Sequence, residues 1–216
     1  MWTKPPSGTT FLYLIRHGAT PPNEQRPYIL QGSGINLGLS PSGQRQAAEV
    51  GKFLGDFPLD HVYSSPMIRA RETAAAIAAP HQQEVRPVEQ LVECSVGYWE
   101  GLDWGTIQQR HPAEARLFLE NPAENPYFGG ESYTDTLHRV RPEFQKLLEQ
   151  HRGESIAIVA HNVVNRVYLA SLLGLDLRRA KELRQQNACV NLITQDDHAT
   201  SVVTMNSVFH LSEQPL

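Results

Sequence analysis

The chain has 216 residues, of which 40% are hydrophobic and 19% charged, and this favours one soluble globular domain with one sizeable core. Its formal net charge is -4 and it has no Lys/Arg run, which argues against nucleic-acid binding, so that any anion site must be local. No stretch has the length and apolar character of a membrane span or a secretory leader, so we expect no membrane partner. The two cysteines, Cys94 and Cys189, do not suggest a disulfide framework, and we expect a cytoplasmic location.

The first predicted strand ends in three residues that can bind an anion. Residues 11–15 are apolar and stop at Arg16, His17 and Gly18, which is typical of a buried strand followed by a polar turn. A guanidinium can donate two hydrogen bonds to a phosphate, a neutral imidazole can be a nucleophile, and glycine lets the backbone approach a ligand closely. Taken alone, these residues fit an ordinary surface histidine as well as a catalytic one.

The next elements alternate between loop, helix and strand. A long Pro/Gly-rich loop, residues 19–39, is of the kind that is usually functional in a compact domain. Ser40 then begins a helix with an apolar stripe at helical spacing, and residues 60–63 form a second strand. A further helix begins at residues 64–66. Arg69 and Arg71 lie in its first turn, about 200° apart around the axis, so we expect at most one to point over the edge of the sheet, the other facing solvent.

An isolated acid and a helical insertion follow the third predicted strand, residues 84–88. Glu93 stands in an otherwise apolar approach to a glycine turn. Residues 102–128 are short helices broken at prolines, and their aromatic residues form either a pocket wall or a small satellite core, of which we favour the core. Ser132 then caps an amphipathic helix.

The last part of the chain repeats the arrangement of strand, histidine and helix. Residues 155–160 are a buried strand that ends at His161 and Asn162, and residues 188–209 form a β-hairpin. This order predicts an α/β fold: a three-layer sandwich with a largely parallel central sheet, helices on both faces and a C-terminal hairpin. Because parallel strands share one carboxyl edge, His17 and His161 are predicted to be neighbours there, beside the free N–H groups of the helix that Asn162 begins.

Several common signatures of phosphate and metal chemistry are missing from the sequence. It has no G-x-x-x-x-G-K-[ST] loop, no arginine five residues after either cysteine and no H-E-x-x-H pair. We therefore expect neither a metal nor a cofactor. A histidine nucleophile is the chemistry that remains.

The ordered motifs at the strand ends resemble the histidine phosphatase superfamily, in its phosphoglycerate-mutase-like branch. The similarity covers nearly the whole chain and rests on Arg16-His17-Gly18, Asn23, Ser64-Ser65-Pro66 with Arg69, Glu93 with Gly97, and Ala160-His161-Asn162. Arg-His-Gly alone is a weak signal, whereas the ordered set is specific. The resemblance implies one domain over residues 1–216, with a small helical cap insertion at about residues 94–131.

The resemblance also implies a role for each matching residue. His17 becomes the phosphate-accepting nucleophile, Glu93 the general acid and base, and His161 a third catalytic residue. Arg16, Arg69, Asn23 and Asn162 become phosphate-binding residues, while Tyr28, Gln31, Gly32 and Trp99 are candidates for the substrate pocket. The implied activity is metal-independent hydrolysis of a small phosphomonoester through a phosphohistidine, and homodimers are common in the family.

Two other functions stay open. Mutases of this family hold a bisphosphate and usually carry basic residues just after the acid, but residues 93–131 contain seven acids against Arg110 and Arg116, which favours a phosphatase unless bases such as Arg26 or Arg86 fold in from elsewhere. A non-catalytic phosphate-binding module would be expected to lack the nucleophile or the acid. The substrate is left open among sugar phosphates, phosphoglycerate and a nucleoside-like phosphate such as α-ribazole phosphate.

Overall fold

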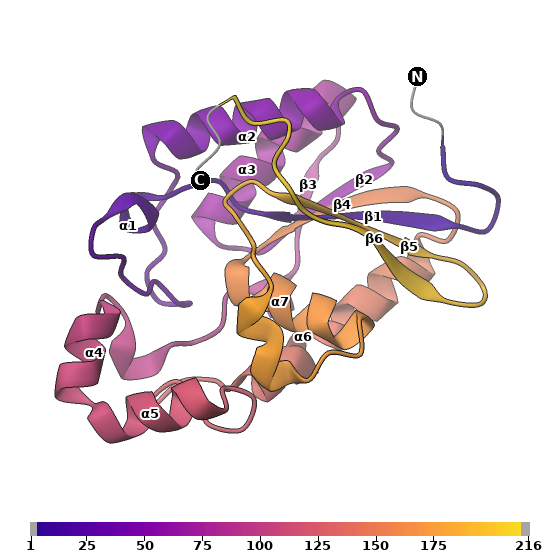
Figure 1. Cartoon of the computed structure of the whole chain (residues 1–216). Coiled ribbons are helices and arrows are strands. Elements are labelled where there is room, and N and C mark those ends of the chain that lie inside the picture. Colours follow the sequence, from indigo (N-terminus) through magenta and orange to yellow (C-terminus); the bar gives the residue numbers. More distant parts are fainter. Residues whose placement is uncertain (1–3, 213–216) are drawn as a thin grey trace.

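The computed structural model describes residues 4–212, in which six strands form one mixed sheet of order β3-β2-β4-β1-β5-β6 (Figure 1). The strands are β1 (Thr10–Arg16), β2 (His61–Ser64), β3 (Val85–Pro87), β4 (Ser155–Ala160), β5 (Val190–Gln195) and β6 (Thr200–Ser207). The first four are parallel, while β5 and β6 are antiparallel and form the predicted hairpin at one edge. The predicted fold class is confirmed.

Helices cover both faces of this sheet. In Figure 1, α2 (Pro41–Leu54) and α3 (Ile68–Ala78) lie on one face, and α6 (Tyr133–Gln150) and α7 (Asn162–Leu172) on the other. Strand β1 divides its side chains between the two layers, because alternate residues of a strand point to opposite faces. Leu12 and Leu14 pack with the α6 and α7 side, whereas Tyr13 and Ile15 pack with the α2 and α3 side. The site therefore rests on a strand buried from both directions.

Short elements complete the described chain, and some of them form the cap. They are α1 (Pro21–Glu24), η1 (Ala79–His81), η2 (Glu89–Leu91), η3 (Gly97–Trp99), α4 (Trp104–Arg110), α5 (Pro112–Glu120) and η4 (Leu177–Glu182). Helices α4 and α5 occupy the predicted insertion and lie beyond the carboxyl end of β1 (Figure 1). The aromatic residues of the insertion are core, as favoured, since Trp99 is fully buried with its ring centroid 5.7 Å from that of Phe118 and 5.9 Å from that of Tyr127. This core is continuous with that of the sheet and is not a separate satellite, and Phe118 and Tyr127 also line a cavity described below.

The helix starts follow the capping residues of the sequence. Ser40 accepts a hydrogen bond from the Gly43 backbone N–H at the start of α2, and Ser132 forms a capping box with Asp135 at the start of α6. Helix α3 begins at Ile68 without a side-chain cap, slightly later than predicted. This difference leaves Ser65 outside the helix and free to contact the site described below.

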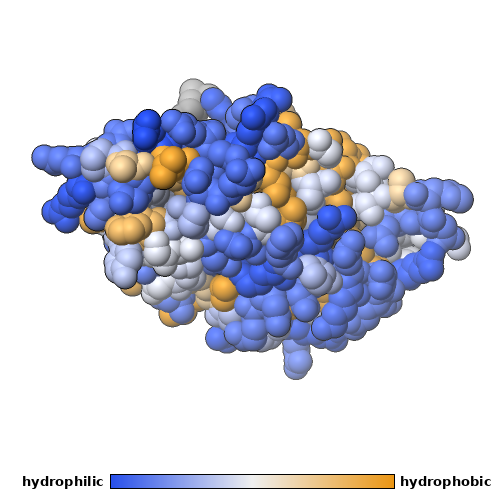
Figure 2. All heavy atoms as spheres, turned by 90° about the horizontal axis from the view of Figure 1, so that it is seen from below, coloured by the Kyte–Doolittle hydropathy of each residue, from blue (hydrophilic) through white to orange (hydrophobic). Residues whose placement is uncertain are grey.

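The surface seen from below in Figure 2 is mostly hydrophilic, with hydrophobic residues in small groups. None of the helices within residues 4–212 combines the length and apolar character that crossing a membrane requires. The single domain, the homodimer and the cytoplasmic location stay predictions. Residues 1–3 and 213–216 of the expected domain lie outside the described part of the chain.

Candidate active site

Two histidines meet at the carboxyl edge of the sheet, as predicted. Strands β1 and β4 are paired in parallel with Arg16 opposite Ala160, so the residue after each strand is a histidine at the same level. The backbone N–H of His17 donates to the carbonyl of Ala160 at 3.1 Å, and the ring centroids of His17 and His161 are 5.2 Å apart. The fold alone brings these distant positions together.

His17 is a buried, neutral imidazole with one nitrogen held by the backbone. Its Nδ1 lies 2.7 Å from the carbonyl oxygen of Gly18, and because a carbonyl only accepts, Nδ1 carries the proton and Nε2 the lone pair. Burial, with the guanidinium groups of Arg69 and Arg16, lowers the pKa of His17 well below its ordinary value of 6.5. A neutral ring with its lone pair on Nε2 is the form that a nucleophile needs.

Gly18 has a packing role that the sequence did not indicate. A Cβ at this position would lie 2.6 Å from the carbonyl oxygen of Gly43, so the missing side chain lets the turn after β1 pack closely against α2. The Gly18 N–H also donates to the Thr73 hydroxyl at 3.0 Å. The glycine thus allows the close packing of the turn that presents His17.

Two buried arginines flank His17. Arg69 donates through Nε to His17 Nε2 at 3.2 Å and through its other nitrogens to the carbonyls of Ile35 and Gly32. Arg16 donates to the carbonyl of Gln185, and its buried Nε has no partner among the described residues. Burial lowers the pKa of both guanidinium groups, but arginine stays charged in proteins, so His17 lies between two cations.

Arg71, two positions beyond Arg69, is exposed, which confirms that only one of the pair turns toward the sheet edge. The expected pocket residue Gly32 has a positive φ of 55° and contributes its carbonyl to Arg69. This glycine therefore fixes the direction of the guanidinium.

His161 and Glu93 complete the cluster. The Nε2 of His161 is 2.7 Å from the hydroxyl of Ser65, and burial together with Arg69 and His17 lowers the pKa of His161 well below 6.5. The Glu93 carboxyl group accepts from the backbone N–H of Cys94 at 2.9 Å. It also accepts from the first turn of α7, through Val163 at 3.3 Å and Val164 at 3.4 Å. Backbone donors at a helix N-terminus thus position this carboxyl group.

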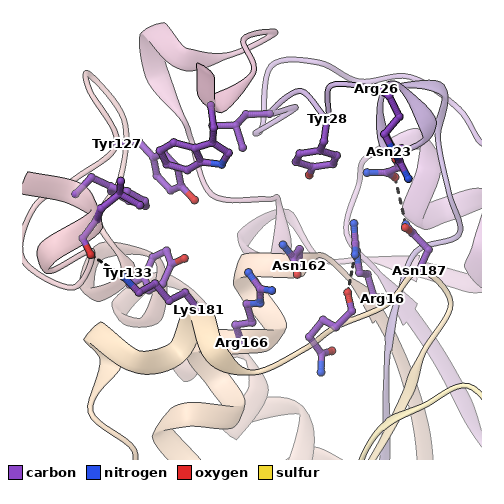
Figure 3. Close-up of a pocket in the computed structure, with 15 residues that line it drawn as sticks. Arg16, Asn23, Arg26, Tyr28, Tyr127, Tyr133, Asn162, Arg166, Lys181 and Asn187 are labelled. Atoms are coloured by element: carbon purple, nitrogen blue, oxygen red, sulfur yellow. Dashed lines mark hydrogen bonds between the residues drawn. The ribbon is translucent and has the colours of Figure 1, made fainter. Parts of the chain in front are cut away.

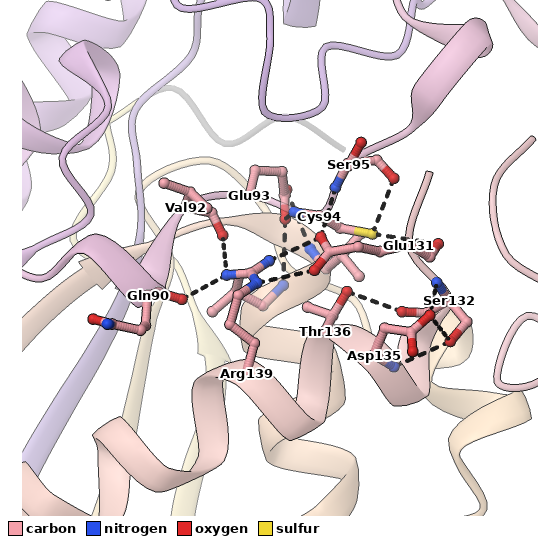
Figure 4. A network of polar contacts seen from close by, with 12 residues as sticks. Gln90, Val92, Glu93, Cys94, Ser95, Glu131, Ser132, Asp135, Thr136 and Arg139 are labelled. Atoms are coloured by element: carbon pink, nitrogen blue, oxygen red, sulfur yellow. Dashed lines mark hydrogen bonds and ion pairs between the residues drawn. The ribbon is translucent and has the colours of Figure 1, made fainter. Parts of the chain in front are cut away.

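An ion pair fixes the loop that carries Glu93 (Figure 4). Arg139 on α6 forms two parallel hydrogen bonds of 2.9 Å with the Glu131 carboxylate, and donates to the carbonyls of Gln90 and Val92. Glu131 in turn accepts from the backbone N–H of Ser95 at 2.8 Å. The backbone on both sides of Glu93 is therefore tied to α6.

Two adjacent cavities contain these groups. A small inner cavity of about 50 Å³ is lined by His17, Arg16, Arg69, Glu93, Asn23 and Asn162, together with the expected pocket residues Tyr28 and Gln31. An outer cavity of about 530 Å³ shares six lining residues with it and opens toward the cap (Figure 3). Trp99 and Gly32 line neither cavity, and Trp104, which packs on Trp99, supplies the indole in the outer wall.

Unpartnered polar atoms in the inner cavity indicate what it can hold. The Asn23 Oδ1 accepts from the Thr20 backbone and from Asn187, which turns its Nδ2 donor away from them. That Nδ2 and the Nε of Arg16 are buried and have no hydrogen-bond partner in the described part of the chain. Because buried donors are almost always paired, these two fit an anion placed beside His17.

The comparisons agree with this geometry. The family model of the histidine phosphatase superfamily (branch 1) matches residues 12–208. The chain belongs to this superfamily. Over 202 residues it is 29% identical to phosphoserine phosphatase 1 of Hydrogenobacter thermophilus, with 94% of each chain covered.

Solved structures of two phosphatases are also similar to this chain. A phosphoserine phosphatase mutant of Entamoeba histolytica in complex with phosphoserine has a TM-score of 0.84 and 26% identity, covering 94% of this chain and 99% of that one. The α-ribazole phosphatase of Shigella flexneri has a TM-score of 0.81 and 26% identity, covering 91% and 96%. This histidine phosphatase is a phosphomonoester hydrolase.

Sequence reasoning missed the cations of the outer cavity. Arg166 and Lys181 line it, and so does Arg26, as allowed for, whereas Arg86 stacks on Tyr63 outside both cavities. Arg166 is one helical turn after Asn162, a spacing that could have revealed it. Lys181 had no such signal.

The acids of residues 93–131 therefore do not make the site unsuitable for an anionic substrate, although the relatives support the phosphatase that this charge count favoured. Glu93 is the only acid of that segment lining either cavity within the described chain. Glu100 accepts from the Gly34 N–H, Asp103 caps α4 and Glu131 pairs with Arg139. Net charge along a segment says nothing about which way its side chains face.

Proposed function

We propose that this histidine phosphatase hydrolyses a small phosphomonoester through a phosphohistidine on His17. The observation that carries the proposal is the neutral His17 ring, with Nδ1 bound to the Gly18 carbonyl and Nε2 facing a cavity that holds two arginines and one carboxyl group. Phosphoryl transfer needs positioning and cationic stabilisation more than covalent chemistry from the protein. This site supplies both.

The first step transfers the phosphoryl group to the histidine. His17 Nε2 attacks phosphorus, a N–P bond forms and the P–O bond to the leaving group breaks. Arg69 turns its Nε–H from His17 to a phosphoryl oxygen, while Arg16 and Asn23 use their unpartnered donors on the others. Glu93 gives its proton to the leaving oxygen.

The second step returns the enzyme to its starting state. Glu93, now a carboxylate, takes a proton from a water molecule whose oxygen attacks the phosphohistidine. The N–P bond breaks, inorganic phosphate leaves and Glu93 is protonated again. His161, held by Ser65, contributes to binding the transferred group from the opposite strand end.

Mutase-type phosphoryl transfer is the alternative that the outer cavity keeps open. A mutase returns the phosphate to a second hydroxyl of a bound substrate, whereas a phosphatase gives it to water. The phosphatases among the relatives support hydrolysis. A non-catalytic module has no support from a cavity that contains both the nucleophile and the acid.

Hydrolysis of p-nitrophenyl phosphate in the presence of a chelator tests this function. His17→Ala is expected to abolish turnover, while His198→Ala, which alters an exposed histidine in the β5–β6 turn, serves as the matched control. If His17→Ala were as active as the wild type, His17 would not be the nucleophile. If the chelator abolished the activity of the wild type, the reaction would not be metal-independent.

A further inference from the structure

The outer cavity concentrates positive charge in an acidic protein. Its lining includes Arg16, Arg26, Arg166 and Lys181, and no Asp or Glu from residues 4–212, although the whole chain has a net charge of -4. In Figure 3, Arg16, Arg166 and Lys181 surround one open space, with Arg26 above Asn23 at its edge. One phosphoryl group in the inner cavity needs Arg16 and Arg69, so the remaining cations have no part in the proposed chemistry.

Arg166 comes from α7 and is held in place by the backbone. Its Nε donates to the carbonyl of Leu183 at 2.7 Å, which orients the guanidinium. No ion pair within residues 4–212 includes it, and its proximity contributes to lowering the pKa of Arg16. A guanidinium without an acid, beside another guanidinium, is a binding group for a carboxylate or a phosphate.

Lys181 comes from η4 and links the body to the cap. Its Nζ donates to the carbonyl of Leu119 near the end of α5, at 2.6 Å. The Leu119 carbonyl is neutral, so this contact does not neutralise the ammonium charge, and the acid next to Lys181, Glu182, forms its ion pair with Arg179. Arg26 is likewise held by backbone carbonyls, those of Asn23 and Gln25. All three cations are therefore positioned by the backbone, and their charges remain available to a ligand.

The cavity also has the dimensions of a small-molecule site. Its volume of about 530 Å³ falls in the usual range for ligand pockets, and Tyr28, Trp104 and Tyr127 give it apolar walls. It borders the inner cavity through shared residues, including Arg16 and Asn162. One molecule can thus extend from His17 to Arg166.

We propose that the substrate carries a second anionic group, a carboxylate or a second phosphate, which Arg166 and Lys181 bind in the outer cavity while the scissile phosphoryl group lies against His17. This inference rests on the proposed function and adds the substrate class. The cations that read the second anion come from α7 and η4, and the segment after Glu93 contributes none.

Two matched pairs of compounds test the substrate class. 3-Phosphoglycerate and glycerol 3-phosphate differ by a carboxylate in place of a hydroxymethyl group, and propane-1,3-diol bisphosphate differs from its monophosphate by one phosphate. We expect the wild-type kcat/KM to be at least tenfold higher for the anionic member of one pair, with the preference falling as KCl is added. The pair that shows it distinguishes the carboxylate from the phosphate. Ratios near one for both pairs overturn the proposal.

Variants then locate the second subsite. Arg166→Gln and Lys181→Gln are each expected to lower that ratio at least fivefold, while Arg71→Gln and Lys52→Gln, which alter exposed cations on α3 and α2, leave it unchanged. An unchanged ratio in both cavity variants overturns the assignment. Far-ultraviolet circular dichroism and thermal unfolding check that each variant folds.

A binding measurement separates this inference from the proposed function. Calorimetric titration of His17→Ala with each compound needs no turnover. Suppose that the wild type hydrolyses no phosphomonoester, but that His17→Ala binds the anionic member of a pair at least tenfold more tightly and a His17→Ala/Arg166→Gln double variant does not. The catalytic proposal then fails and the subsite stands. Equal affinities within both pairs contradict the subsite whatever the catalytic result.

Discussion

Replacement of Arg69 by lysine separates the charge of this residue from its geometry. The Arg69 side chain is 1% exposed and reaches three acceptors: His17 Nε2 at 3.2 Å, the Ile35 carbonyl at 2.8 Å and the Gly32 carbonyl at 3.0 Å. One ammonium nitrogen cannot occupy the positions of three guanidinium nitrogens. Arg69→Lys therefore keeps the positive charge near the phosphoryl group but loses the donor aimed at it.

The expected cost follows from that lost donor. Removal of one preorganised donor to a developing oxyanion lowers kcat by about 10²–10³, or about 2.7–4 kcal/mol. We expect a loss of this size in Arg69→Lys. A larger loss is expected in Arg69→Gln, because a cation about 4 Å from an anion contributes roughly 4 kcal/mol at an effective dielectric of 20, before desolvation.

Steady-state hydrolysis of p-nitrophenyl phosphate between pH 4 and pH 8 measures both effects. Arg69 is also a cause of the lowered pKa of His17, so Arg69→Gln should move the acid limb of kcat/KM to higher pH, whereas Arg69→Lys should move it less. Arg71→Lys is the matched control. Activity of Arg69→Lys within threefold of wild type, or an unmoved acid limb in Arg69→Gln, would refute the reasoning.

Three further predictions concern stability. Trp99→Ala removes a fully buried indole packed on Phe118 and Tyr127, and in denaturant titrations it should lower the unfolding free energy by about 3–5 kcal/mol. The control is Tyr98→Ala, which alters a residue that is 71% exposed and should change the unfolding free energy by less than about 0.5 kcal/mol. Gly18→Ala places a methyl group 2.6 Å from the Gly43 carbonyl oxygen and should cost about 1–3 kcal/mol with loss of activity; normal stability would contradict the close packing of the turn after β1 on α2. Below pH 6.5, His17 and His161 become protonated in the unfolded chain but stay neutral in the folded chain. The unfolding free energy should therefore fall with decreasing pH, by up to about 1.4 kcal/mol per pH unit for each histidine. An unchanged slope in a His17→Asn/His161→Asn variant would show that these histidines do not cause the pH dependence.

The sequence was sufficient for the parts of the fold that depend on local pattern. The apolar runs before His17 and His161 mark β1 and β4, and Ser40 and Ser132 mark helix starts. Strand ends in a parallel sheet share an edge, so the pairing of the two histidines followed from topology alone. Short-range signals and one topological rule thus brought the two histidines together, whereas the roles of Arg69, Asn23 and Glu93 came from the family resemblance.

The outer cavity could not be predicted, because it depends on side-chain direction in elements far apart in the chain. Lys181 and Arg26 meet there only after η4 and the loop of α1 have been placed against the cap. Trp99 and Trp104 are five residues apart and both aromatic, yet one is buried in the core and the other faces the cavity. Composition cannot distinguish these outcomes, which are decided by packing.

The phosphohistidine is tested most directly by rapid quenching of Glu93→Gln mixed with p-nitrophenyl phosphate. The nitrophenolate leaves with little need of a proton, whereas hydrolysis of the intermediate needs the Glu93 carboxylate. We expect a burst of about one nitrophenol per enzyme in Glu93→Gln, together with acid-labile phosphate on His17. Neither should be seen in His17→Ala, and Glu124→Gln, which alters an exposed acid of the cap, should turn over as the wild type does. No burst in Glu93→Gln together with no phosphate on His17 would contradict the phosphohistidine.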